Sequence, residues 1–130
     1  MTKQEHIAYW VKTAGDDWDA IQKMYKVKTY IHALFFAHLV LEKLLKAHWI
    51  KDNEGNTPPK IHNLVVLVHK TKLKLEDDDM IFLDRMNDLQ LEGRYPEYIT
   101  NVYKIYKRKE TGLILEQVDK IRKCLLKNLQ

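Results

Sequence analysis

The longest apolar stretch of the chain reads YIHALFFAHLVLEKLLKAHW, from Tyr30 to Trp49. A helix over this stretch would be apolar almost all the way round, and such a helix must be covered on most sides by the rest of the protein. The same stretch nevertheless contains Glu42, Lys43 and Lys46. Charged groups are costly to remove from water, so they need a partner or a use. The sequence therefore predicts a central helix whose few charges point through a gap in the packing or serve a site.

Size and composition limit what can surround this helix. The chain has 130 residues, of which 45% are hydrophobic and 31% are charged, as is typical of a soluble globular protein. This length supports one core, so we expect a single domain over residues 1–130. Four glycines and three prolines leave little material for turns, which disfavours a sheet with many hairpins. The formal charge of +4 is a mild preference for anionic partners and not the signature of a dedicated nucleic-acid binder.

The sequence carries no sign of export or of a membrane span. Cys124 is the only cysteine and cannot form an internal disulfide, which favours a reducing compartment. The N-terminal residues are polar and lead into no signal-peptide core. The apolar run over residues 34–41 is too short to cross a bilayer. We therefore expect a cytoplasmic protein.

Helix signals recur on both sides of the central stretch. Apolar residues spaced three or four apart, together with residues that favour N-caps, mark the other helices. We predict helices over residues 3–25, 30–51, 64–71, from 77 to a point before Gly93, and after residue 111. The predicted N-caps of the first, second, third and fifth of these helices are Thr2, Thr29, Asn63 and Thr111. The aromatic and basic segment 97–109 has no firm periodicity and is predicted to be an ordered connection. The result is an all-α, up-and-down helical bundle of four longer helices and one short helix.

Four short motifs follow one another along the chain. They are Tyr9-Trp10 with Asp17, EKLLKA at residues 42–47, PKIHNL at residues 59–64 and GRYP at residues 93–96. In order and spacing they resemble the HEPN family, the higher-eukaryote and prokaryote nucleotide-binding domains, in its small stand-alone prokaryotic form. The resemblance implies a bundle like the substrate-binding subunits of nucleotidyltransferases. It also implies a homodimer, a small nucleotidyltransferase as partner in a toxin–antitoxin-like pair, and a role in binding a nucleotide or RNA.

The chain departs from the RNase members of that family, which carry an arginine followed four to six residues later by a histidine. The last histidine here is His69, and no histidine follows any arginine (Arg85, Arg94, Arg108, Arg122). RNA cleavage without a metal usually needs a group that exchanges protons near neutral pH, and histidine suits that role best. We therefore predict a non-catalytic binding and interaction module. The alternatives are an RNA-cleaving toxin with an atypical site and a purely structural dimer without a ligand.

The residues that we expect to bind a nucleotide or phosphate share charged, hydrogen-bonding or stacking side chains. They are Glu42, Lys43, Lys46, His62, Arg94 and Tyr95, which would line a polar cleft between the second and third helices and the chain after the fourth. In this interpretation lysine and arginine hold phosphate and the tyrosine stacks on a base.

Each of these residues also has a structural interpretation. Glu42 and Lys46 stand at the spacing of a helix ion pair. His62 can fix its turn by bonding an acidic side chain. Arg94 can pair with Glu42, and Tyr95 can pack on the bundle.

Other kinds of site receive little support. The histidines match neither zinc nor di-iron spacing, so we expect no metal. The sequence has no Gly-rich phosphate loop and no serine, which excludes a serine-triad hydrolase, and we expect no cofactor and no catalytic residue. Tyrosines mixed with Lys104, Lys107 and Arg108 suit single-stranded RNA, although such a segment is more often a connector with inward tyrosines. The apolar second helix also favours a dimer.

Overall fold

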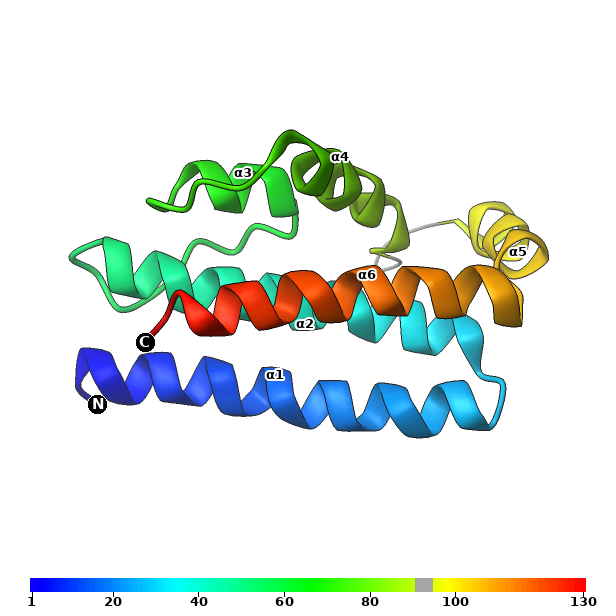
Figure 1. The fold of residues 1–130 in the computed structure, drawn as a ribbon, viewed down its shortest axis with the longest axis horizontal. Helices are drawn as coiled ribbons and strands as arrows, with labels where there is room; N and C mark the ends of the chain where they lie inside the picture. Colours follow the sequence, from blue (N-terminus) through cyan, green and yellow to red (C-terminus); the bar gives the residue numbers. More distant parts are fainter. Residues whose placement is uncertain (91–94) are drawn as a thin grey trace.

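Six α-helices and one 3-10 helix make up the parts of the chain that a computed structural model describes, residues 1–90 and 95–130 (Figure 1). In chain order they are α1 (Lys3–Lys26), α2 (Tyr30–Asp52), α3 (Leu64–His69), α4 (Asp77–Met86), η1 (Asn87–Leu89), α5 (Pro96–Ile105) and α6 (Arg108–Lys127). No strand occurs in either range. The predicted all-α bundle is confirmed, with one helix more than expected.

Three long helices, α1, α2 and α6, run side by side along the molecule (Figure 1). The pair α3 and α4 covers one side, α5 lies at one end, and both ends of the chain lie at the opposite end. The central element is α2, which contacts α1, α3, α5, α6 and η1. None of the helices in the described ranges combines the length and the apolarity that crossing a membrane requires.

The composition of α2 explains its central place. Its buried apolar residues come from every side of the helix, among them Leu34, Val40, Leu41, Leu45 and Ile50. Other helices of the same chain cover them, so this surface is not left for a second copy. The inference from an apolar second helix to a dimer therefore loses its basis.

A Schellman turn joins α1 to α2. Lys28 follows the C-cap of α1 and has a φ of 66°, the left-handed conformation of this motif. The Thr29 amide donates to the Met24 carbonyl at 2.9 Å, and the Lys28 amide donates to the Tyr25 carbonyl at 3.1 Å. The Thr29 hydroxyl also donates to the Met24 carbonyl and makes no N-cap bond. The prediction that this threonine caps the second helix with its side chain is wrong, because the end of α1 takes its hydroxyl.

Two other predicted N-caps are confirmed. Thr2 Oγ1 accepts a hydrogen bond from the Glu5 amide at 3.1 Å at the start of α1. Asn63 Oδ1 accepts from the Val66 amide at 3.1 Å at the start of α3. Both bonds span three residues, so they depend on local sequence alone.

The last helix begins earlier than predicted. Thr111 lies inside α6 and is buried, whereas the helix starts at Arg108. Glu110 favours this start, because its carboxylate accepts a hydrogen bond from the Lys107 amide at 3.2 Å. The prediction of Thr111 as the N-cap is therefore wrong.

The segment predicted to be a connection contains helix α5. Pro96 is its first residue, where the missing amide would have no partner in any case. Val102 is buried, and Tyr98 and Tyr106 pack against the core four residues to either side of it. The prediction of a non-helical connection is wrong. Tyr98 and Val102 stand one helical turn apart and face the core, but most other residues of the segment are exposed, which hides the periodicity.

Candidate functional site

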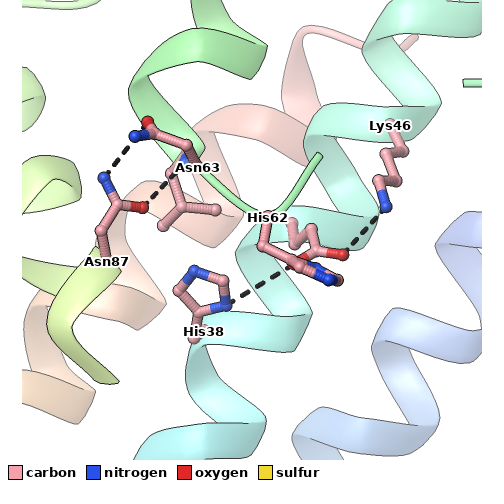
Figure 2. A network of polar contacts seen from close by, with 7 residues as sticks. His38, Lys46, His62, Asn63 and Asn87 are labelled. Atoms are coloured by element: carbon pink, nitrogen blue, oxygen red, sulfur yellow. Dashed lines mark hydrogen bonds and ion pairs between the residues drawn. The ribbon is translucent and has the colours of Figure 1, made fainter. Parts of the chain in front are cut away.

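Polar side chains meet around one carboxylate of α2. Glu42 Oε2 accepts a hydrogen bond from Lys46 Nζ at 2.9 Å, one turn further along the helix. Glu42 Oε1 accepts a hydrogen bond from His62 Nδ1 at 3.0 Å, and this histidine lies in the loop before α3. Figure 2 shows Lys46 and His62 converging from these two elements, with His38 beside them. We call Glu42, Lys46, His62 and His38 the Glu42 cluster.

The ion pair of the cluster is buried, whereas its loop imidazole reaches the surface. The side chains of Glu42 and Lys46 are 6% and 8% exposed, and that of His62 is 50% exposed. The Lys46 ammonium also lies 5.6 Å from the centre of the Trp10 ring on α1, within range of cation–π attraction. Lys46 is thus held by a carboxylate and an aromatic face, and His62 is the member that a solute meets first.

His38 lies one turn before Glu42 and is fully buried. Its Nδ1 is 3.7 Å from Glu42 Oε1, and neither ring nitrogen makes a hydrogen bond within the described ranges. Burial lowers the pKa of His38 to about 4, although the negative charge of Glu42 and the nearby polar group of Asn87 act in the opposite direction. His38 is therefore neutral near pH 7.

Two asparagines tie the end of α4 to the start of α3, next to His62. Asn87 Oδ1 accepts a hydrogen bond from the Leu64 amide at 2.8 Å. Asn87 Nδ2 donates to Asn63 Oδ1 at 3.2 Å. Figure 2 shows this pair beside His38 and His62. The chain that leaves α4 therefore starts close to the Glu42 cluster.

The structure brings together three of the six predicted site residues, Glu42, Lys46 and His62. Lys43 points elsewhere, because its Nζ donates to Asp17 Oδ2 on α1 at 2.5 Å. Tyr95 is the N-cap residue of α5 and is 79% exposed. Arg94 lies outside the described residues. Binding of phosphate or nucleotide by these residues stays a prediction.

Two polar neighbours of the cluster, His38 and Asn87, were not among the predicted site residues. The sequence does indicate the place of His38, because a polar residue one turn before Glu42 on a buried helix lies on the same face as Glu42. The role of Asn87 could not be predicted in this way, since nothing in the local sequence links this residue to residue 64. Within residues 1–90 and 95–130, no group of three or more histidine, cysteine, aspartate or glutamate side chains is arranged to hold a metal ion.

Comparisons with known proteins agree with this architecture. A family model of the HEPN domain matches residues 7–129, nearly the whole chain. Among solved structures, the fold is similar to the crystal structure of TT1696 from Thermus thermophilus, with a TM-score of 0.77. That match covers 95% of this chain and 98% of the other at 17% sequence identity, so it shows a shared fold alone. No curated protein matches the sequence.

Separating the Glu42–Lys46 pair is expected to destabilise the fold. The variant Lys46→Met leaves the buried carboxylate without its ammonium partner, which typically costs about 3 kcal/mol. The double variant Glu42→Leu/Lys46→Met removes both buried charges and is expected to recover most of that loss. Urea unfolding of the single and double variants gives the coupling free energy, which we expect to exceed about 1 kcal/mol.

Lys12 and Asp16 offer a matched control for this cycle. They form an ion pair of the same spacing on α1, at 3.0 Å, but their side chains are 76% and 62% exposed. The same measurement on that pair is expected to give about 0.5 kcal/mol or less. Equal coupling energies at the two pairs would show that burial is not what makes the Glu42–Lys46 contact matter.

His38 is expected to make the protein less stable in mild acid. Its folded-state pKa is about 4, whereas a histidine of the unfolded chain takes up a proton near pH 6.5. Between these values the unfolded state binds more protons, so its free energy falls relative to the folded state. The free energy of unfolding should drop by up to about 3 kcal/mol as the pH falls through this window. Unfolding in urea at several pH values measures the slope.

The variant His38→Gln should flatten this pH dependence, and His32→Gln should not, because His32 is exposed on the same helix. Burial also lowers the pKa of His48, so part of the slope should remain in both variants. Identical slopes for the His38→Gln variant and the natural protein would refute the assignment to His38.

Proposed function

The chain belongs to the HEPN domain family, and from that membership we propose that it is a non-catalytic member that binds the phosphate of a nucleotide or RNA end at the Glu42 cluster. The observation that carries this proposal is the surface-reaching imidazole of His62, fixed by a hydrogen bond to a buried carboxylate. The mild positive charge of the chain favours an anionic ligand in the same sense.

His62 is held in a way that suits recognition. A carboxylate only accepts hydrogen bonds, so the ring gives its Nδ1 proton to Glu42 and its orientation is set. When the ring is protonated, its other nitrogen donates as well, and a phosphate oxygen is a strong acceptor for such a bond. Lys46 binds the other oxygen of the same carboxylate and offsets its negative charge, while its own side chain is almost fully buried.

Tyr95 and Arg94 are proposed to complete the ligand site. Tyr95 is 79% exposed and offers a flat face on which a base can stack. Arg94 precedes it and is expected to hold phosphate with its forked guanidinium. The contact of Asn87 with the Leu64 amide is in keeping with this proposal, because it holds the end of α4 beside the loop of His62.

We further propose that the protein acts as a homodimer beside a small nucleotidyltransferase, as the family resemblance implies. In this role the bundle presents a nucleotide or RNA end and the partner performs the chemistry. The toxin–antitoxin-like pairing belongs to the same proposal. A small nucleotidyltransferase encoded by the neighbouring reading frame would support it.

Substitutions in the proposed ligand site are expected to weaken binding of ATP without unfolding the protein. The variants His62→Ala and Arg94→Ala each remove one charge-assisted hydrogen bond, and Tyr95→Ala removes a stacking face. Each should raise the Kd about tenfold. Isothermal titration with ATP measures this effect, and circular dichroism checks the fold.

Matched controls lie on helices α3 and α5. His69→Ala removes an exposed imidazole from the last turn of α3, and Tyr103→Ala removes a tyrosine that is 49% exposed on α5. Neither should change the Kd. No measurable binding by the natural protein, or equal affinity for site and control variants, would remove the proposed ligand site.

The pairing of Glu42 with His62 also favours a second candidate, an RNA-cleaving toxin with an atypical site. A buried carboxylate that orients an imidazole is the arrangement that makes histidine an effective proton acceptor. In this role His62 would take the proton of a ribose 2′-hydroxyl as that oxygen attacks the neighbouring phosphate. The proton donor for the leaving oxygen would have to come from another group.

RNA integrity separates the two candidates. A cleaving enzyme is expected to fragment total RNA and to arrest growth on expression, and His62→Ala should abolish both effects while His69→Ala keeps them. Gel or capillary electrophoresis after incubation with concentrated protein measures the fragments. Intact RNA after incubation with the natural protein would exclude RNA cleavage and favour the binding module.

A further inference from the structure

A shallow groove runs between α4 and α6 on the outside of the bundle, with a volume of about 540 Å³. Its walls include Asp78, Ile81, Phe82 and Arg85 on α4, and Leu113 and Ile114 on α6. Figure 1 shows the two helices as neighbours, with α4 above α6 in that view. Ile81 and Leu113 are 54% and 58% exposed. Large apolar side chains left this open in one groove mark a contact surface.

The groove wall formed by α4 has a negative charge at one end and a positive charge at the other. Asp78 and Arg85 lie two helical turns apart on the same face, with Ile81 and Phe82 between them. Neither charged residue forms an ion pair within the described ranges. The wall therefore reads acidic, apolar, apolar, basic from the N-terminal to the C-terminal end of the helix.

We propose that this face of α4 is one half of a twofold interface, in which the groove receives α4 of a second copy of the chain in antiparallel orientation. A twofold axis that passes between Ile81 and Phe82 places Asp78 of one copy opposite Arg85 of the other. The symmetry repeats the pair, so two ion pairs flank an apolar centre. Isologous contacts have this property, because a single surface must be complementary to itself.

Charge complementarity selects a second copy as the occupant. A groove for a strongly acidic or strongly basic partner would carry one sign of charge, whereas this wall carries both signs in balanced positions. The remaining exposed acids of α4 (Asp77, Asp84 and Asp88 just beyond its end) do not line the groove. The inference rests on the homodimer proposed above and is independent of the ligand proposed for the Glu42 cluster.

Charge reversal tests the pairing. The variants Asp78→Arg and Arg85→Asp each place like charges opposite one another twice, and each should raise the dimer Kd at least about tenfold. The double variant Asp78→Arg/Arg85→Asp should restore the dimer. An equimolar mixture of the two single variants should form a heterodimer. The Asp78→Arg variant has positive charges at residues 78 and 85, and the Arg85→Asp variant has negative charges at both, so opposite charges face each other at both places. Sedimentation velocity and native mass spectrometry measure these species.

Controls and outcomes separate this inference from the proposed function. Asp19→Arg makes the same change at an exposed position of α1 and should leave the dimer intact, and titration with ATP should be unaffected by the α4 variants. A natural protein that stays monomeric at high micromolar concentration would overturn the dimer itself. If the single charge reversals leave the dimer intact, or if the double variant fails to restore it, this interface is overturned. The proposal of a homodimer would then stand with a different interface.

Discussion

The buried carboxylate of Glu42 is the constraint around which the bundle is arranged. Placing such a group inside a helix core costs several kcal/mol unless cations and donors reach it. Here one donor comes from the same helix and one from the loop before α3, twenty residues away. The core can therefore close around α2 only when that loop is docked, which links a local helix sequence to the position of α3.

The same polar groups also set how α2 is rotated. A helix that is apolar all round has no preferred face, so hydrophobic burial alone leaves its orientation open. Lys43 reaches Asp17 on α1, Lys46 faces the Trp10 ring on α1, and Glu42 faces the loop before α3. These contacts support the interpretation that the few charges of α2 select one packing from several of similar apolar area.

Whether a contact could be predicted from the sequence depends on how far apart its two residues lie along the chain. The caps at Thr2 and Asn63 and the Glu42–Lys46 pair span three or four residues, and local spacing is enough to find them. The predicted cap at Thr29 was wrong because its hydroxyl bonds the end of the preceding helix. Helix α5 was missed because few of its residues face the core and most of the segment is exposed. For His62 the sequence suggested a bond to an acidic side chain but could not name Glu42, and the role of Asn87 was not predicted, because contacts between distant residues leave no periodic pattern in the sequence.

Helix α4 belongs to both proposed surfaces. Its end carries Asn87, which holds the start of α3 beside His62, while its outer face carries Asp78 and Arg85. The two surfaces use different parts of this segment, and no residue of one surface belongs to the other. Because the two sets of side chains do not overlap, one short helix can serve assembly and ligand binding separately.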